Sequence, residues 1–522
     1  MTGVQIHGLT VRGPQGVMVE PFDATIAPGR TLAIIGESGS GKTLSAKSLI
    51  GLLPRGFRAA GTAVVGDSTL ALDAAPAAWT SVRGSTVALL LQDPFTSLSP
   101  VHRCGDQIAW TLRAASDRRI AASDLAREVA ARLAEVKLPE RVARAFPHQL
   151  SGGMRQRVAI AAALAADPKL LIADEPTTAL DASNQAEILD LLRAVQSRRD
   201  LSVILISHDL GLVRGRTDDV LVMQHGVIVE RGATGDVLSA PKHPYTRALI
   251  DADPVLAPPR EAPAPAVEET PTLVQATGVT KHFGQRTVLD GVDLRIGEGE
   301  IVGVVGESGS GKSTLARCIA GLEREDGGVI SFGGTDLTPG RRSRTPAQMQ
   351  IVFQDPYSSL NPMMSIGSIL REALAVAHRP ASDVAVLLET VGLPTDFAGK
   401  RPAELSGGQR QRVAIARALA PRPRLLICDE SVSALDVSVQ AQILTLLTAL
   451  RDDLGISLLF ISHDLAVVRL LADSVTVLWD GRVIESGPCE QVLTEPRHEY
   501  TRMLVAAAHR ENTSVSAGER ED

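Results

Sequence analysis

Two glycine-rich segments of nearly identical sequence constrain the fold of this chain more than any other feature. Residues 36–43 read GESGSGKT and residues 306–313 read GESGSGKS. After each segment the same short motifs follow in the same order, and Asp174 and Asp429 in the later part of the repeat are 255 positions apart. A glycine-rich turn before a helix exposes backbone N–H groups that bind phosphate. The repeat therefore predicts two copies of one nucleotide-hydrolysing domain.

The residues around each glycine-rich segment predict an α/β fold. β-branched runs at 31–35 and 301–305 end at the segments, and helices are expected at 44–52 and 315–321. Later in each copy, apolar residues at helical spacing precede another short apolar run, which predicts a helix followed by a buried strand. Strands that alternate with helices predict a parallel sheet with helices on both faces, and one such sheet is expected in each copy.

Composition predicts where the two domains begin and end. The chain has 522 residues, and the repeat assigns 1–250 to the first domain and 272–505 to the second. Residues 251–271 are rich in Pro and Ala, which predicts an extended linker. The polar and charged tail at 506–522 is predicted to be disordered. A helical insert without strand patterns is expected in each domain, at about 93–158 and 355–412.

Charge, cysteine content and hydropathy exclude several classes of protein. The formal net charge is −7, which argues against bulk binding of nucleic acid, so no nucleic-acid partner is predicted. The 4 cysteines lack the spacing of a metal or iron–sulfur site and predict reduced thiols in a cytosolic protein. No apolar run approaches the ~20 residues that cross a bilayer, so other subunits would have to span a membrane.

The glycine-rich segments carry the residues expected to bind the phosphates. Glycines let the backbone approach the phosphates, the helix N-terminus adds a favourable dipole, and the lysine places a point charge on the outer phosphates. The predicted phosphate-binding residues are Gly36, Ser38, Gly39, Gly41, Lys42 and Thr43 in the first copy and Gly306, Ser308, Gly309, Gly311, Lys312 and Ser313 in the second.

Polar residues at the ends of later strands are expected to hold Mg²⁺ and the attacking water. In each copy an apolar run ends in an Asp-Glu pair, whose Asp suits Mg²⁺ and whose Glu suits orientation or deprotonation of water. A histidine after the next strand is interpreted as a contact to the terminal phosphate and the water. The predicted metal ligands are Thr43, Gln92, Asp174, Ser313, Gln354 and Asp429. The predicted catalytic residues are Glu175, Glu430, His208, His463, Gln92 and Gln354.

A second anion-binding motif points to the family. LSGGMRQ begins at Leu150 and LSGGQRQ begins at Leu405, and each opens a predicted helix that serine caps. Because each copy already has a phosphate loop, this motif is expected to complete the nucleotide site of the other copy. The motif resembles the signature of ABC ATPases, whose domains sandwich two ATP molecules head to tail. The residues concerned are Ser151, Gly152, Gly153, Ser406, Gly407, Gly408 and Gln409.

The resemblance covers nearly the whole chain and implies its fold and cofactors. It implies two tandem ABC-type P-loop ATPase domains, each with a RecA-like parallel-sheet core and an inserted helical subdomain. ATP and Mg²⁺ are the implied cofactors, and the two domains are implied to pair head to tail within the chain. Asp181 and Asp436 would then lie across the interface and couple the two sites.

Further motifs resemble one branch of importers. Asp-Pro follows Gln92 and Gln354, and each copy ends in Pro-x-His-x-Tyr-Thr-Arg, at 241–247 and 496–502. These motifs resemble the ATPases of oligopeptide, dipeptide and nickel importers, here with the two ATPase subunits fused. The resemblance implies a peripheral subunit at the cytoplasmic face of the membrane that powers uptake of peptides or related solutes. Its implied partners are two integral-membrane permeases and, through them, an extracytoplasmic solute-binding protein.

The two copies depart from the family pattern in different places. Phe283 fits the aromatic residue that stacks under adenine, whereas the matching residue in the first copy is Gly13. Met154 stands where the second copy has Gln409, and Ser431 stands where Pro usually follows the catalytic Glu. Because both copies retain the lysine and the catalytic Glu, both sites are predicted to hydrolyse ATP.

Two other classes of protein share parts of this pattern. An ABC-F-type ribosome-associated ATPase also has two copies, but a long charged helical linker is expected there, and residues 251–271 are Pro-rich. A sugar-type ABC importer ATPase fusion typically has one degraded site, and both sites here have their motifs. The sequence does not indicate which solute is carried.

Overall fold

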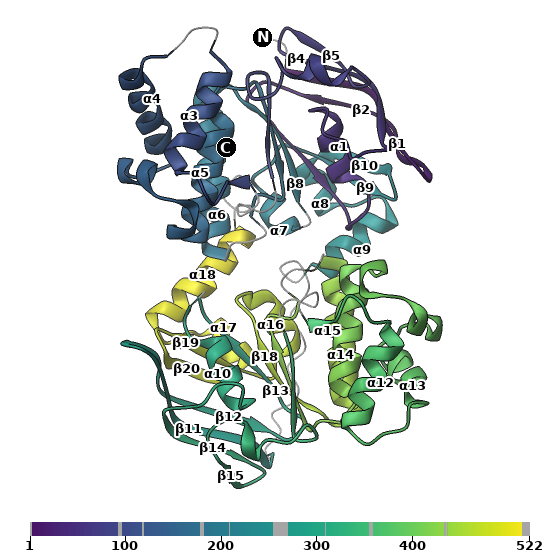
Figure 1. Cartoon of the computed structure of the whole chain (residues 1–522), viewed down its shortest axis with the longest axis vertical. Helices are drawn as coiled ribbons and strands as arrows, with labels where there is room; N and C mark the ends of the chain where they lie inside the picture. The colour runs from purple at the N-terminus through teal and green to yellow at the C-terminus, as the bar shows by residue number, and fades with distance from the viewer. Residues whose placement is uncertain are drawn as a thin grey trace, which may run out of the picture. The chain divides into compact units, whose positions relative to one another are not determined.

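The computed structural model divides the chain into two compact units, which meet at Asp253 and Pro254 in the sequence (Figure 1). It describes residues 3–91, 97–116, 120–177, 182–207, 209–253, 270–307, 309–353, 359–432, 435 and 437–513. The predicted site residues Gln92, His208, Ser308 and Gln354 lie outside the described residues, as do Asp181 and Asp436. Most of the predicted linker, at 254–269, lies outside them as well.

The first unit is built on a six-stranded sheet of order β10-β9-β3-β8-β7-β6. All neighbouring strands are parallel except β9 and β10, which pair antiparallel at one edge. Every residue of β3, β7 and β8 is buried, as expected for strands covered on both faces. The strands are β3 (Thr31–Ile35), β6 (Val87–Leu90), β7 (Leu170–Asp174), β8 (Ser202–Ser207), β9 (Asp219–Gln224) and β10 (Val227–Ala233).

The second unit repeats this sheet in the order β16-β17-β18-β13-β19-β20, again with one antiparallel pair at the edge. The predicted α/β fold is therefore confirmed in both copies. Its strands are β13 (Ile301–Val305), β16 (Met349–Val352), β17 (Leu425–Asp429), β18 (Ser457–Ile461), β19 (Ser474–Trp479) and β20 (Arg482–Pro488).

Each unit also has a four-stranded antiparallel sheet, which the sequence did not predict. Its first two strands form a hairpin, and register shifts interrupt their pairing in several places, for example between Ile6 and Leu9. Such bulges break the alternation of apolar and polar residues by which a strand is recognised. The strands are β1 (Val4–Gly13), β2 (Gly16–Ile26), β4 (Arg58–Val65) and β5 (Ser68–Ala71), and β11 (Thr272–Phe283), β12 (Arg286–Gly297), β14 (Gly327–Phe332) and β15 (Thr335–Leu337).

The inserts are helical, as predicted, and their described residues contain no strand. In Figure 1, α3, α4 and α5 gather on one side of the first unit. The helices are α3 (Cys104–Ala114), α4 (Ala122–Glu135) and α5 (Gly152–Leu164) in the first unit and α12 (Ile366–Val376), α13 (Asp383–Thr390) and α14 (Gly407–Leu419) in the second. Short 3₁₀ turns are η1 (Pro76–Trp79), η2 (Glu140–Arg144), η3 (Pro147–Gln149), η4 (Arg341–Ser343), η5 (Thr395–Gly399) and η6 (Pro402–Glu404).

The remaining helices cover the six-stranded sheets and end each unit. Helix α18 continues past residue 506 into the stretch predicted as a disordered tail, and 514–522 lie outside the described residues. The helices are α1 (Lys42–Ser48), α6 (Ala182–Arg199), α7 (Leu210–Val213), α8 (Thr234–Ser239), α9 (Pro244–Ala252), α10 (Lys312–Ile319), α15 (Val437–Leu454), α16 (Leu465–Leu471), α17 (Cys489–Thr494) and α18 (Glu499–Thr513).

The state of the cysteines and the hydropathy of the helices can be compared with what the composition predicts. All four cysteines are buried free thiols, and burial raises the pKa of Cys104 to about 11 and that of Cys428 to about 12. Cys428 is thus a buried small hydrophobe, as predicted, because a thiol with so high a pKa is rarely the reactive thiolate. In the described part of the chain, none of the helices combines the length and the hydropathy needed to cross a membrane.

Candidate nucleotide-binding sites

The motifs that lie far apart in the sequence meet at one edge of each six-stranded sheet. In the first unit, β7 and β8 are in parallel register with Asp174 opposite Ile206, and β3 and β8 with Ile35 opposite Ser207. Because these strands run in the same direction, the phosphate loop, the Asp-Glu pair and the segment before His208 leave the sheet at its carboxyl edge. Ligands of open α/β sheets bind at this edge.

The backbone of each phosphate loop requires glycine at its first position. Gly36 has φ 147° and Gly306 has φ 152°. A Cβ at Gly36 would lie 2.1 Å from the carbonyl oxygen of Met223, and one at Gly306 would lie 2.1 Å from that of Leu478. Any side chain would therefore push the loop away from the neighbouring strand and displace its N–H groups.

The loop lysines are buried and point back onto their own loops. Lys42 Nζ donates to the carbonyls of Gly36 at 2.6 Å and Glu37 at 2.8 Å. Lys312 repeats both hydrogen bonds at the same distances, to the matching residues of its loop. Only 5% of Lys42 and 4% of Lys312 is exposed, so each ammonium group is held inside the loop, where phosphates would be bound.

The Asp of each Asp-Glu pair is hydrogen bonded to the loop hydroxyl. Thr43 Oγ1 donates to Asp174 Oδ1 at 3.1 Å, and Ser313 Oγ donates to Asp429 Oδ1 at 2.8 Å. Burial raises the pKa of both carboxyl groups above the ordinary value, although these hydrogen bonds lower it. A hydroxyl and a carboxylate side by side are the hard oxygen ligands that Mg²⁺ prefers, so the residues present fit this ion.

A second pair of serines in the loops carries buried hydroxyl groups. Ser40 is 4% exposed and Ser310 is 5% exposed, and within the described residues neither Oγ has a hydrogen-bond partner. A buried polar atom left without a partner costs free energy, so it usually meets a water or a ligand. Both loops therefore contain a hydroxyl group that a bound phosphate could satisfy.

The Glu that follows each Asp has an unusual backbone conformation. Glu175 has φ 49° and Glu430 has φ 48°, in the left-handed region that non-glycine residues rarely occupy. In the second unit His463 Nδ1 lies 3.7 Å from Glu430 Oε1, and this contact lowers the pKa of Glu430 below the ordinary value. The structure thus brings Glu430 and His463 together, while the matching contact of Glu175 would involve His208, outside the described residues.

The signature serines cap their helices, as predicted. Ser151 Oγ accepts from the N–H of Met154 at the start of α5, and Ser406 Oγ accepts from that of Gln409 at the start of α14. In α14 the Gln409 side chain also accepts from the N–H of Ser406 at 3.0 Å, which completes a capping box. Met154 cannot accept this hydrogen bond, so α5 starts without the box.

One signature glycine has a role in packing that the sequence interpretation missed. A Cβ at Gly408 would lie 2.2 Å from Cγ1 of Val439, on the following helix α15. Glycine is therefore required there for close approach of the two helices, in addition to any contact of its N–H group with an anion.

The position predicted to stack on the adenine base differs between the copies. Phe283 is 49% exposed at the end of β11, and the Lys281 ammonium lies 5.1 Å from the centre of its ring. In the first copy, a Cβ built on Gly13 would lie only 2.7 Å from Cε1 of Phe57. The space that a side chain at position 13 would enter is thus taken by the ring of Phe57, which comes from the segment before β4 and was not predicted as a site residue.

Two tyrosines that the sequence interpretation used only as family markers contact the phosphate loops. The hydroxyl of Tyr245 accepts from the N–H of Glu37 at 2.9 Å, and that of Tyr500 accepts from the N–H of Glu307 at 3.0 Å. The repeated Pro-x-His-x-Tyr-Thr-Arg segment indicated that these tyrosines matter. The sequence could not predict their contact with the loops, because the segment is far from the loops along the chain.

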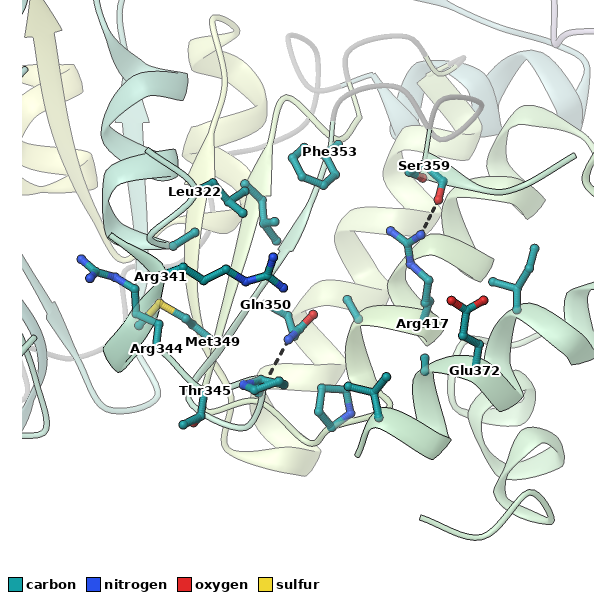
Figure 2. Close-up of a pocket in the computed structure, with 18 of the residues that line it drawn as sticks. Leu322, Arg341, Arg344, Thr345, Met349, Gln350, Phe353, Ser359, Glu372 and Arg417 are labelled. Atoms are coloured by element: carbon teal, nitrogen blue, oxygen red, sulfur yellow. Dashed lines mark hydrogen bonds between the residues drawn. The ribbon is translucent and has the colours of Figure 1, made fainter. Parts of the chain in front are cut away.

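A groove of about 550 Å³ lies in the second unit between the sheet core and the helical insert (Figure 2). One side is formed by β16 with Gln350, and the other by α12 with Glu372 and Val376 and by α14 with Arg417. Figure 2 shows Arg417 reaching toward Ser359, to whose carbonyl it donates. Phe353 and Ser359 also line the groove.

Two protein-family models match the chain. The model described as ABC transporter matches residues 19–178 and 289–433, once in each unit. The model described as oligopeptide/dipeptide transporter, C-terminal region, matches residues 229–287 and 484–519. The first match includes each Asp-Glu pair, and the second includes Tyr245 and Tyr500.

Curated relatives resemble the chain over almost its full length. It is 42% identical to the glutathione import ATP-binding protein GsiA of Shigella boydii, over 94% of this chain and 86% of that protein. It is 41% identical to the peptidoglycan transport ATP-binding protein YejF of Agrobacterium fabrum, over 95% of this chain and 94% of that protein.

Solved structures support the fold. The archaeal ribosome recycling factor aABCE1, solved with a ribosomal stalk protein, superposes with a TM-score of 0.64 at 21% identity, over 96% of this chain and 92% of that one. A structure described as RNase-L inhibitor gives 0.63 at 21% identity, over 95% and 92%. At this identity the similarity concerns the fold alone.

Proposed function

The chain belongs to the ABC transporter family, and we propose that its two sites hydrolyse ATP to drive import of short peptides or peptide-containing solutes through partner permeases. The observation that carries the proposal is the repeat of one complete geometry. In both units a buried loop lysine, a loop hydroxyl and a buried Asp meet at the carboxyl edge of the sheet. Purified chain should hydrolyse ATP, and the double variant Lys42→Ala, Lys312→Ala should not.

Within each site the chain's own residues would do three things. Lys42 and the loop N–H groups would bind the phosphates, Thr43 and Asp174 would hold Mg²⁺, and Glu175 would orient or deprotonate the attacking water. The corresponding residues of the second unit have the same roles. Mg²⁺ would supply positive charge for the phosphate oxygens when bound.

We infer that each ATP-binding site is completed by the signature helix of the other copy. Ser406 and its neighbours would face the first loop, and Ser151 and its neighbours the second. A Ser151→Cys, Glu307→Cys chain tests this with a short bismaleimide, since the four native thiols are buried. Cross-linking should occur with ATP in a Glu430→Gln background and not with either single cysteine. Equal cross-linking with and without ATP would contradict nucleotide-dependent pairing.

The groove in the second unit is proposed to receive an amphipathic segment of a permease. Its lining combines apolar side chains exposed to solvent, Leu322 at 44% and Val376 at 64%, with the charged Arg341 and Glu372. The groove lies between the helical insert and β16, the strand before Gln354. A segment bound there would therefore contact both parts, and a movement of the insert relative to the sheet core would displace it.

Substitution of a groove residue separates coupling from hydrolysis. Val376→Glu should leave the ATPase rate of the isolated chain unchanged and lower transport-coupled ATPase in the reconstituted complex severalfold. Val386→Glu is the matched control, because Val386 is 53% exposed on α13 and does not line the groove. If both variants couple normally, the groove does not receive the permease.

The relatives' names suggest the class of solute. Glutathione and peptidoglycan both contain peptide, and both names describe import or transport. We propose the cytoplasmic face of the membrane as the location, and a solute-binding protein on the other side as the component that selects the solute. Uptake assays of the reconstituted complex with peptide, nickel-chelate and sugar panels test the class, and uptake of sugar alone would contradict it.

A further inference from the structure

A hydrogen-bond path leads from the C-terminal part of each unit to its phosphate loop. In the first unit the N–H of Glu37, the second residue of the loop, donates to the hydroxyl of Tyr245 on α9. In the second unit the N–H of Glu307 donates to the hydroxyl of Tyr500 on α18. The two units of the chain thus make the same contact at nearly the same distance, 2.9 and 3.0 Å.

The turn before each tyrosine is held by a carboxylate. In the first unit the two oxygens of Glu230 accept from the N–H groups of Lys242 at 2.8 Å and His243 at 3.1 Å, and His243 Nδ1 accepts from the N–H of Tyr245 at 3.2 Å. These bonds fix the direction in which α9 begins, and with it the direction of the tyrosine ring.

The second unit repeats this turn residue for residue. Glu485 accepts from the N–H groups of Arg497 and His498, at 2.8 and 3.0 Å, and His498 Nδ1 accepts from the N–H of Tyr500 at 3.1 Å. We call the segment from the carboxylate to the tyrosine, residues 230–245 and 485–500, the C-terminal strap.

The strap holds a residue that also holds the loop lysine. The N–H of Glu37 is bound by Tyr245, and the carbonyl of the same residue accepts from Lys42 Nζ at 2.8 Å. Loss of the tyrosine hydroxyl would free Glu37 to rotate, and the ammonium group would lose its fixed position. Glu307 and Lys312 have the same relation to Tyr500.

We propose that Tyr245 and Tyr500 are positioning residues of the two nucleotide sites. Each tyrosine keeps the second residue of its phosphate loop, and through it the loop lysine, in the arrangement that receives the outer phosphates of ATP. The proposal rests on the proposed phosphate-binding role of Lys42 and Lys312. Because the strap lies within the transporter C-terminal region at 229–287 and 484–519, that region would set the ATP affinity of the core.

The two straps differ in how firmly they hold the ring. Trp479 stacks on Tyr500, with ring centres 5.5 Å apart and planes at 28°. The residue 255 positions earlier, which matches Trp479 in the repeat, is Gln224. Stacking should keep the ring beside Glu307 even when its hydroxyl is removed, and the ring would then still limit movement of the loop, so loss of the hydroxyl should matter more at Tyr245.

The test removes the hydroxyl and keeps the ring, in the full chain. Tyr245→Phe should raise KM for ATP about fivefold, the usual effect of one neutral hydrogen bond, and lower kcat less. Affinity for adenosine, which has no phosphate, should stay the same, because only the phosphate loop is disturbed. Tyr500→Phe should show the same pattern with a smaller change. Glu230→Gln weakens the bonds from the N–H groups of Lys242 and His243, which are not in the loop, so it should raise KM for ATP by a smaller factor.

Matched controls remove a hydroxyl hydrogen bond elsewhere in the same unit. Ser202→Ala removes the bond from the Ser202 hydroxyl to the carbonyl of Ala27, and Ser457→Ala removes the bond from the N–H of Gly299 to the Ser457 hydroxyl. Both should lower the thermal midpoint slightly and leave KM for ATP unchanged. A purely structural role of the tyrosines would give their variants this same result, or would weaken adenosine and ATP alike, and either outcome overturns the proposal.

The failure of this proposal can be told apart from failure of the proposed function. If Lys42→Ala, Lys312→Ala abolishes ATP binding while both tyrosine variants stay within about twofold of the parent KM, only the positioning role is wrong. If the lysine variant binds ATP normally, the phosphate-binding role fails and the positioning role fails with it.

Discussion

In both units the loop lysine donates to the same two carbonyls at 2.6 and 2.8 Å, and the loop hydroxyl donates to a buried Asp. Around these groups the units differ. The second unit has the exposed Phe283 at the position predicted to stack on the base, a complete capping box at Ser406 and Trp479 stacked on its strap tyrosine. The first unit has Gly13 beside Phe57, no capping box at Ser151 and Gln224 at the position of Trp479.

The difference separates residues that face the phosphates from residues that surround them. Among the described residues, the groups expected to touch the phosphates and Mg²⁺ are the same in both copies, which favours hydrolysis at both sites. The groups expected to contact the base, and those that cap the signature helix or stack on the strap tyrosine, differ, so we expect the copies to be unequal in nucleotide affinity and local stability.

The largest expected effect comes from replacing the catalytic Glu of each site, which tests whether the two sites are equivalent. Glu175→Gln and Glu430→Gln, made separately, should each nearly abolish hydrolysis at its own site, since a general base contributes about 10²–10⁴-fold, and should lower the ATPase rate of the full chain by at least the share of that site. Glu→Gln keeps the size of the side chain, so both variants should fold, although Glu430→Gln loses the charged contact to His463 and should have a slightly lower thermal midpoint at neutral pH. A variant that hydrolyses ATP at the parent rate would show that its site is regulatory and that the two sites are not equivalent.

Substitution of Phe283 and Phe57 tests whether the two sites bind the adenine base differently. Phe283→Ala should weaken binding of ATP at the second site about tenfold, because base–aromatic stacking contributes about 1–3 kcal/mol. If Phe57 replaces the missing aromatic, Phe57→Ala should weaken the first site similarly. Titration of a fluorescent adenosine nucleotide into each variant measures this. Phe332→Ala, on β14, controls for loss of an aromatic elsewhere in the second unit.

Exchange of one signature residue tests the capping box. Met154→Gln should add the missing hydrogen bond at α5 and raise the free energy of unfolding by about 0.5–1 kcal/mol, while Gln409→Met should lower it by about the same amount. Thermal or denaturant unfolding of the full chain detects both. Changes of the same sign in the two variants would show that the side chain acts through another contact.

The smallest expected effect concerns pH. Burial raises the pKa of Glu485, but the N–H groups of Arg497 and His498 and the Thr501 hydroxyl lower it more, so the net pKa lies below the ordinary value. A carboxyl group of this kind stabilises the fold above its unfolded pKa and loses that contribution as pH falls through the folded pKa. Glu485→Gln should therefore lower the thermal midpoint at neutral pH, and the difference from the parent should vanish in acid.

Prediction from sequence succeeded where a local pattern reports directly on structure. Strands at 31–35 and 301–305 are β3 and β13, since a β-branched run before a glycine-rich turn leaves few alternatives. The predicted helix at 44–52 is instead Lys42–Ser48, because Gly41 is already the N-cap. The antiparallel sheets were missed, since bulges interrupt the alternation that marks a strand.

By itself the sequence determined the family, the two copies and the residues expected at the phosphates, because spacing within a short loop is a local property. Only the tertiary structure decided which distant residues support those loops. Tyr245 is 208 positions from Glu37 in the sequence, and Tyr500 is 193 positions from Glu307. Phe57, in the segment before β4, lies beside Gly13 at the end of β1. Contacts of this kind depend on how strands and helices pack, which no spacing along the chain records.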